Sequence, residues 1–112
     1  MKYMRYMAED AGIADMLKAM GKEIEAIDGI VEVEFDITSF LDNTPYVILI
    51  PKYDIDVRRE DYYDARRKQI EDILSVCKKY DCYRTEDRIE DYGEHWYIVT
   101  RYKGKFNNFI CL

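Results

Sequence analysis

Two aspartates lie two positions apart in Asp54-Ile55-Asp56, at the end of a predicted strand. Carboxylates at positions i and i+2 of a strand share a face and can bind Mg²⁺ together, as they do in phosphoryl-transfer sites. The sequence lacks the other parts of such a site, because it has no GxxxxGK[ST] loop and no third acid at a recognisable spacing. A short D-x-D also arises easily by chance in a chain with 23 acidic residues. We therefore expect no metal site, and a metal-dependent phosphoryl-transfer enzyme using Asp54 and Asp56 is the weakest alternative.

Nucleophilic catalysis has equally little support in the sequence. His95 is the only histidine, and neither Ser39 nor Ser75 lies in a G-x-S-x-G motif. The cysteines are odd in number and form no CxxC pair, which disfavours a disulfide scaffold and a zinc ribbon. They are Cys77, Cys82 and Cys111. We expect reduced thiols in a cytoplasmic protein that is not an enzyme and needs no cofactor.

The stretch VEVEFDI, residues 31–37, alternates apolar and acidic residues without a break. As a strand, it would place three carboxylates in a row on one face, about 6.6 Å apart. These are Glu32, Glu34 and Asp36. Four apolar side chains would point inward from the other face: Val31, Val33, Phe35 and Ile37. The pattern therefore predicts a half-buried strand with an acidic outer side.

The acidic row has two interpretations. Its spacing is close to twice the axial rise of about 3.4 Å per phosphate along one DNA strand, so the row could imitate phosphates and occupy a nucleic-acid-binding protein. Alternatively, it is a solvated sheet face whose charges are neutralised by basic residues on neighbouring strands. The candidates for such neutralisation are Arg84, Arg88 and Arg101. The two interpretations differ in whether an arginine lies opposite the row.

Charge is shared unevenly along the chain, which carries a net charge of −6. Residues 1–56 hold 12 acids and 5 bases, whereas residues 57–112 hold 11 acids and 12 bases. The one basic cluster is Arg66–Lys68, with Arg58 and Arg59 upstream, and acids such as Asp64 are interleaved with it. Pairs such as Asp64–Lys68 would neutralise this cluster on a helix. We therefore expect a helix face with many salt bridges and no direct binding of nucleic acid.

Aromatic residues carry the most useful remaining signal. The chain has 11 tyrosines, more than two helix faces can bury, and tyrosine is enriched at protein interfaces. The C-terminal FNNFICL adds further large apolar residues. Together these features favour a protein-binding surface or a homodimer contact. The predicted partner-binding residues are Glu32, Glu34, Asp36, Tyr46, Tyr53, Tyr97, Phe106 and Phe109.

Hydrophobic periodicity predicts the elements that position these residues. Apolar spacings of three and four predict a helix over 13–27 and a second helix over 60–80. Residues 1–12 either extend the first helix or form a separate segment before it. Asp61 is the predicted N-cap of the second helix. Strands are predicted over 30–38, 46–53, 82–90 and 95–102, with DYGE as a hairpin turn between the last two. The core VILI of the second strand is apolar on both faces, which predicts a central strand covered on each side within the chain or by a partner.

The order αββαββ predicts an α+β fold in one domain, residues 1–112. We expect a mostly antiparallel four-stranded sheet with both helices packed on one face, and the pattern leaves the strand order open. No apolar run approaches the roughly 18 residues of a membrane span, and MKYMRYMAED has no apolar signal region. The sequence therefore predicts no membrane partner.

In size, acidity and tyrosine content the chain is similar to small phage counter-defence inhibitors, such as anti-CRISPR proteins, and to toxin-immunity proteins. No sequence motif carries this resemblance. It implies a non-enzymatic protein that inhibits a partner by binding it, and the acidic row directs this expectation at a basic, nucleic-acid-binding partner. The alternatives are a toxin-immunity-like binding protein and a structural homo-oligomer that assembles through its C-terminal tail.

Overall fold

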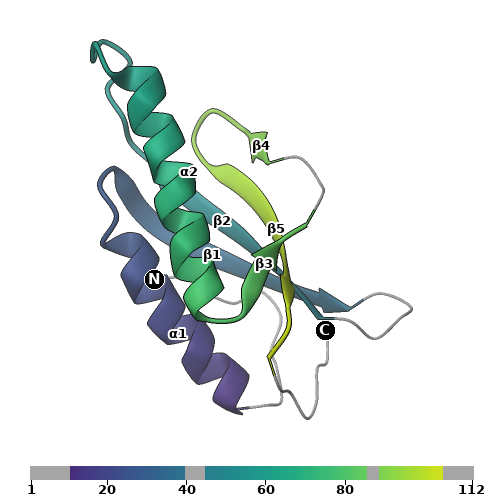
Figure 1. Ribbon diagram of the computed structural model, residues 1–112. Helices are drawn as coiled ribbons and strands as arrows, with labels where there is room; N and C mark the ends of the chain where they lie inside the picture. The colour runs from purple at the N-terminus through teal and green to yellow at the C-terminus, as the bar shows by residue number, and fades with distance from the viewer. Residues whose placement is uncertain (1–10, 40–44, 86–88, 105–112) are drawn as a thin grey trace.

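The computed structural model describes residues 11–39, 45–85 and 89–104. Seven elements follow one another along this part of the chain: α1 (Ala11–Glu25), β1 (Ile30–Ser39), β2 (Pro45–Tyr53), α2 (Tyr62–Lys79), β3 (Cys82–Arg84), β4 (Glu90–Asp91) and β5 (Trp96–Tyr102). Both helices lie on the same face of the sheet (Figure 1). The predicted α+β class is therefore confirmed, as is the packing of two helices on one face. Neither described helix is long and apolar enough to cross a membrane.

The strands pair antiparallel throughout, in the order β1-β2-β5-β3, and β4 also pairs with β5. The central position predicted for β2 is confirmed, because it lies between β1 and β5. The described residues form five strands where four were expected. The strand predicted over 82–90 is two short strands, β3 opposite Thr100–Tyr102 and β4 opposite Trp96–Tyr97.

A tight turn connects β4 to β5, as the sequence DYGE predicted. Gly93 has a φ of +85°, a conformation that glycine adopts without steric cost. Its backbone N–H donates a hydrogen bond of 2.9 Å to Oδ1 of Asp91. The N–H of Tyr92 donates to the carbonyl of His95 at 3.0 Å, which closes the hairpin.

β1 keeps the predicted alternation of buried and exposed side chains except at Val31, the first residue that was expected to point inward. Val33, Phe35 and Ile37 are fully buried, as expected, but Val31 is 55% exposed. The pairing register shifts between Ile30 and Glu32, so one extra residue bulges out of the ladder at this point. The prediction that Val31 points inward is therefore wrong, and Ile30 occupies the inward position.

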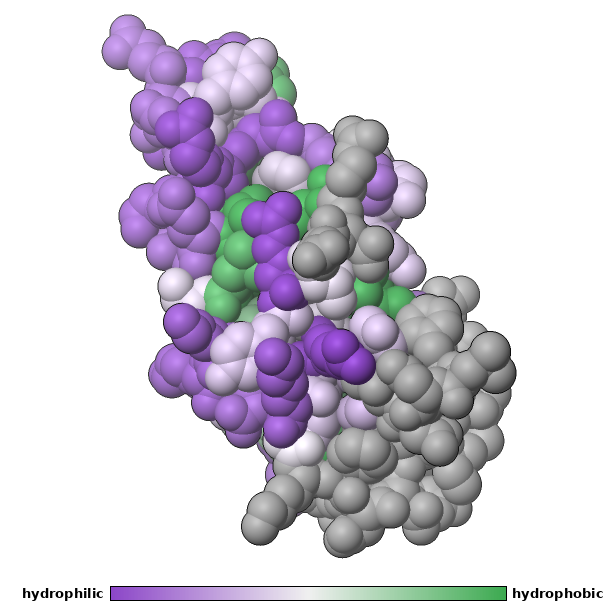
Figure 2. All heavy atoms as spheres, turned by 45° about the vertical axis from the view of Figure 1, so that its right-hand side comes forward, coloured by the Kyte–Doolittle hydropathy of each residue, from purple (hydrophilic) through white to green (hydrophobic). Residues whose placement is uncertain are grey.

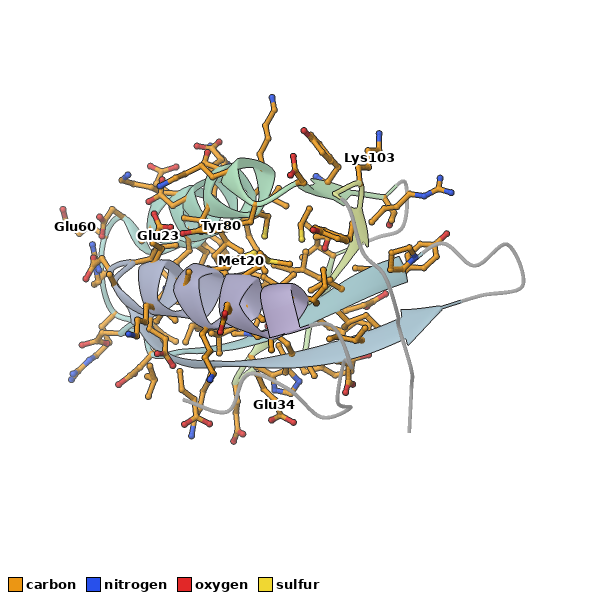
Figure 3. The ribbon with its side chains drawn as sticks, turned by 90° about the horizontal axis from the view of Figure 1, so that it is seen from below. Met20, Glu23, Glu34, Glu60, Tyr80 and Lys103 are labelled. Carbon is orange, nitrogen blue, oxygen red and sulfur yellow. The ribbon has the colours of Figure 1, made fainter. Side chains whose placement is uncertain are left out.

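The apolar faces of the helices form the core with the inner face of the sheet. On α1 the residues at spacings of three and four are buried as predicted: Ile13, Leu17, Met20 and Ile24. Gly12 lies within α1 and does not break it. The two helices are joined at the surface by Glu23, whose carboxylate accepts hydrogen bonds from Lys79 and from the hydroxyl of Tyr80 (Figure 3). These bonds hold the pKa of Glu23 below its ordinary value.

A buried polar contact attaches α2 to the sheet. Gln69 is only 3% exposed. Its Oε1 accepts a 3.0 Å hydrogen bond from the indole Nε1 of Trp96 on β5. Its Nε2 donates to the backbone carbonyl of Asp28 at 3.0 Å, just before β1. One side chain of α2 therefore fixes both the α1–β1 turn and the start of β5.

A second polar contact lies beside the first. Arg66 of α2 forms an ion pair with Asp91 of β4, and its guanidinium lies over the ring of Trp96 at 4.9 Å. Asp91 also accepts a 2.7 Å hydrogen bond from the hydroxyl of Tyr53 at the end of β2. The β4–β5 hairpin is therefore held against α2 by charge as well as by apolar packing.

Candidate binding surface on the outer face of the sheet

The sheet presents a second face on the side opposite the helices. Successive strand residues point to opposite sides, so the side chains between the buried positions of β2 lie on this second side. Figure 3 shows Glu34 of β1 pointing away from α1 here. We call this surface the outer face and define it by its described side chains: Glu32, Glu34, Asp36, Tyr46, Ile48, Ile50, Lys52, Glu90, Tyr97, Val99 and Arg101.

The acidic row of β1 lies on the outer face, as the alternation predicted. Glu32 is paired with Lys52 across the ladder, Glu34 with Ile50 and Asp36 with Ile48. In the described part of the chain, neither Glu32 nor Glu34 forms a side-chain hydrogen bond or an ion pair. Asp36 differs from them because it is only 8% exposed. The accessible carboxylates of the row are therefore Glu32 and Glu34.

The arginines expected to neutralise the row do not lie opposite it. Arg101 is on β5 and Arg84 is on β3, and β2 separates both strands from β1. Arg101 instead pairs with Tyr46, with its guanidinium 6.0 Å from the centre of that ring. Arg88 lies outside the described residues. Lys52 is therefore the one basic residue of the described chain that is paired directly with the row across the β1–β2 ladder.

The tyrosines predicted to bind a partner are divided between the two faces. Tyr46 and Tyr97 lie on the outer face and are partly exposed. Tyr53 has the opposite orientation and is only 9% exposed. Its ring lies 5.0 Å from that of Trp96, and burial raises the pKa of its hydroxyl, which the charge of Arg66 opposes. Tyr53 is thus a core residue and not a surface contact.

Phe106 and Phe109 of the predicted partner-binding set lie outside the described residues. Cys111 does as well. The assembly through the C-terminal tail therefore stays a prediction.

Asp54 and Asp56 do not share a strand face, because β2 ends at Tyr53. The carboxylate of Asp56 binds Arg58 through three hydrogen bonds of 2.9, 3.1 and 3.0 Å, from the backbone N–H, Nε and Nη2. This arginine holds the pKa of Asp56 below its ordinary value. Among the described residues, no group of three or more His, Cys, Asp or Glu side chains could hold a metal ion. Asp56 is therefore committed to an arginine rather than open to a cation.

The basic cluster around the start of α2 is paired with aspartates throughout. Figure 2 shows hydrophilic side chains dominating this end of the molecule. Two of the partners differ from expectation, since Asp64 binds Arg67 at 3.5 Å and Lys68 binds Asp72 at 3.1 Å. The remaining pairs are Arg58–Asp56, Arg59–Asp61 and Arg66–Asp91. With each charge matched in this way, the cluster has the character of a helix with many salt bridges, as predicted.

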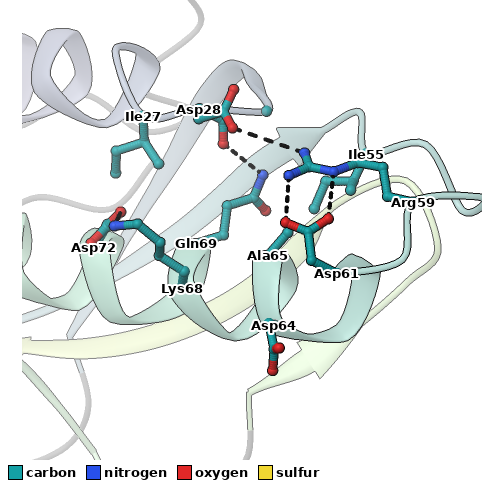
Figure 4. A pocket seen from close by; sticks show the side chains of 11 residues that line it. Ile27, Asp28, Ile55, Arg59, Asp61, Asp64, Ala65, Lys68, Gln69 and Asp72 are labelled. Carbon is teal, nitrogen blue, oxygen red and sulfur yellow. Dashed lines mark hydrogen bonds and ion pairs between the residues drawn. The ribbon is translucent and has the colours of Figure 1, made fainter.

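An open pocket of about 320 Å³ lies between the α1–β1 turn and the start of α2 (Figure 4). Its basic side chains are both paired, Lys68 with Asp72 and Arg59 with Asp61. Asp61 occupies the predicted N-cap position but does not cap the helix, because both of its oxygens accept 2.8 Å hydrogen bonds from Arg59. The pocket therefore offers no spare cation to an anionic ligand.

The two described thiols are unreactive because they are buried. Cys77 and Cys82 are buried and free. Burial raises the pKa of both thiols, and that of Cys82 reaches about 12. A thiolate is the reactive form of cysteine, so neither residue is suited to nucleophilic chemistry at neutral pH.

Apolar residues make up the centre of the outer face, and the predicted set omitted them. They are Ile48, Ile50 and Val99, all partly exposed. The signal for two of them was present in VILI, whose apolar character on both faces predicted a covered second side. Glu90 was also omitted, because its pairing with Tyr97 depends on the separate strand β4. No family model, curated protein or solved structure matches the chain.

Proposed function

We propose that this protein is a small, non-enzymatic, cytoplasmic binding protein whose outer face occupies a basic surface of a protein partner. The single observation that supports this proposal is the state of Glu32 and Glu34. Both carboxylates lie on β1 without an ion pair in the described chain, and Glu34 faces an isoleucine across the ladder. A basic partner would supply the missing countercharges.

The kind of partner follows from the charge and spacing of the row. Carboxylates about 6.6 Å apart on a strand repeat at about two phosphate steps of a nucleic-acid strand. A nucleic-acid-binding protein presents a basic surface to such a charge pattern. Occupation of that surface inhibits the partner by competition, as the resemblance to anti-CRISPR and toxin-immunity proteins implies.

A charge-reversed variant tests the proposal. In Glu32→Lys/Glu34→Lys both accessible acids of the row are reversed, and Asp36 is left intact because reversing a residue that is 8% exposed would disturb folding. The matched control is Glu60→Lys/Glu71→Lys, which changes the net charge equally at two exposed positions near and on α2. Tagged forms of all three proteins are used to capture partners from host cells and from phage-infected cells.

The wild-type protein and the control should capture the same basic, nucleic-acid-binding protein, and duplex DNA should compete with both. The Glu32→Lys/Glu34→Lys variant should lose this partner while keeping its far-ultraviolet circular dichroism. Equal capture by the variant and the control would refute the role of the row.

Self-association is the second candidate function, and the apolar centre of the outer face favours it. Two copies would bury this centre against each other. Light scattering across a concentration series distinguishes the candidates. A dimer that Ile50→Ser dissociates would support self-association, whereas a monomer at all concentrations would leave partner binding as the function.

A further inference from the structure

One line of paired residues runs across the strands of the outer face and places an isoleucine and a tyrosine between two carboxylates. Glu34 on β1 is paired with Ile50 on β2, and Glu90 on β4 is paired with Tyr97 on β5. The β2–β5 register continues from Ile48 opposite Val99 to the bridge between Lys52 and His95, which places Ile50 opposite Tyr97. Paired residues point to the same face. Across the four strands β1, β2, β5 and β4, this line of side chains is therefore glutamate, isoleucine, tyrosine and glutamate.

The adjacent row extends the apolar centre along the strands. Ile48 and Val99 lie beside each other, next to the Ile50–Tyr97 pair. We call Ile48, Ile50, Tyr97 and Val99 the apolar stripe. A positive charge lies beyond it at each end, with Lys52 after Ile50 on β2 and Arg101 after Val99 on β5, where Arg101 is paired with Tyr46. The stripe is thus two residues long, or about 6.6 Å, on each of two strands.

These dimensions match an α-helix. Glu34 and Glu90 are separated by three strand spacings, about 14 Å, whereas a helix with its side chains is about 10–12 Å wide. Apolar residues at positions i and i+4 of a helix rise about 6 Å along its axis, close to the length of the stripe. An extended peptide would instead need a free strand edge for its backbone hydrogen bonds, which a sheet face cannot supply.

We infer that the outer face binds a short basic amphipathic helix of the partner, lying along β2 and β5. Its apolar residues at i and i+4 contact Ile48, Ile50, Tyr97 and Val99, and its lysines or arginines reach Glu34 on one side and Glu90 on the other. Charge complementarity selects this occupant, because acids flank the stripe on both sides. This inference rests on the proposed function and specifies the element of the partner that is recognised.

The test uses a designed, fluorescently labelled peptide of about 18 residues, long enough to form a helix. Leucines occupy positions i, i+3, i+4 and i+7, and lysines flank them on both sides. The control peptide has the same composition with leucine and lysine alternating, so that it cannot present an apolar helix face. Fluorescence anisotropy measures the affinity of each peptide for the intact protein at several salt concentrations.

The helical peptide should bind at least about tenfold more tightly than the alternating peptide, because only it can bury its leucines on the stripe. Ile50→Ser should weaken this binding about tenfold, whereas Val57→Ser, at a position 72% exposed in the loop before α2, should not change it. Glu34→Gln/Glu90→Gln should weaken it about fivefold at low salt and less at high salt, unlike Glu60→Gln/Glu71→Gln.

Equal affinity for the two peptides, or an unchanged affinity in Ile50→Ser, would overturn the helix inference. So would binding to anionic phosphatidylglycerol vesicles that Ile50→Ser abolishes, because the stripe would then serve a lipid surface. A failed peptide test combined with loss of the captured partner in Glu32→Lys/Glu34→Lys would refute only the helix. Failure of both experiments would refute the proposed function as well.

Discussion

The indole Nε1 of Trp96 donates a 3.0 Å hydrogen bond to Oε1 of Gln69 in the interior, between β5 and α2. Both residues are buried, at 6% and 3% exposure. The same amide donates from Nε2 to the carbonyl of Asp28. This glutamine therefore joins three parts of the chain that lie far apart in sequence, and it positions the strand that carries Tyr97 and Val99 on the outer face.

Replacing Gln69 with leucine should destabilise the fold. The indole N–H of Trp96 and the carbonyl of Asp28 would both lose their partner, and an unsatisfied buried polar group costs about 1–3 kcal/mol. Urea unfolding of Gln69→Leu measures this loss. The control is Glu71→Leu, which introduces the same side chain at an exposed position of α2 and should change the free energy of unfolding by about 0.5 kcal/mol or less. Equal stability of the two variants would show that the hydrogen bonds contribute nothing.

Gly29 in the α1–β1 turn can be compared with Gly93 in the β4–β5 turn to test how tightly the first turn is packed. Gly29 and Gly93 have nearly the same φ, +81° and +85°. A Cβ at Gly29 would lie 2.5 Å from Nε2 of Gln69, whereas a Cβ at Gly93 would meet nothing within 4 Å. Gly93→Ala should therefore cost only the backbone strain of a left-handed residue, about 1–2 kcal/mol.

Gly29→Ala should cost at least about 1 kcal/mol more than Gly93→Ala, because the new methyl group displaces the Gln69 amide from its hydrogen bonds. Thermal and urea unfolding of both variants give the difference. Equal losses would mean that Gln69 moves aside without cost. A double variant with Gln69→Leu provides a further check, since the excess cost should shrink when the amide is absent and only the 3.3 Å contact of the new methyl group with Ile55 remains.

The contact between Glu23 and the end of α2 should make stability depend on pH. Hydrogen bonds from Lys79 and then Tyr80 hold the pKa of Glu23 below its ordinary value of 4.5. A lowered pKa in the folded state means that the unfolded chain takes up the proton more readily. The contribution of Glu23 is therefore complete above pH 4.5 and is lost as the pH falls through the lowered pKa.

Unfolding of the wild-type protein and Glu23→Gln at a series of pH values measures this contribution. The stability difference should be constant near neutral pH and should shrink in acid. It should shrink again in strong base, because the pKa values of Lys79 and Tyr80 are raised and their protons leave above their ordinary range. Glu71→Gln, at an exposed position of α2, is the control for removing a negative charge. A difference that does not vary with pH would contradict the contact.

Much of the local structure could be predicted because it follows from periodicity within one segment. The apolar residues of α1 recur at helical spacing, and those of β1 from Val33 onward alternate, so each segment identifies its own buried face. The turn before β5 was equally clear, because Gly93 permits a conformation that other residues resist. Such features need no knowledge of distant parts of the chain.

Alternation did not determine the orientation of β2, because Val47 and Ile48 are both apolar and either could have faced the helices. Only the packed structure turned Val47, Leu49 and Tyr53 inward and left Ile48 and Ile50 on the outer face. For the same reason, Tyr53 was wrongly assigned to the surface. The bulge at Val31 also depends on pairing with β2, which no local pattern reports.

The sequence by itself therefore determined the two helices, the strands β1, β2 and β5, and the acidic side of β1. The tertiary structure alone decided what lies beside that acidic side. Strand order depends on which segments pair over long chain distances, and placing β2 between β1 and β5 separated Glu34 from Arg101. The same order placed Glu90 at the far side of the apolar stripe. The sequence left open whether the acids of β1 are neutralised, and the pairing of the strands places Glu34 and Glu90 on either side of the apolar stripe.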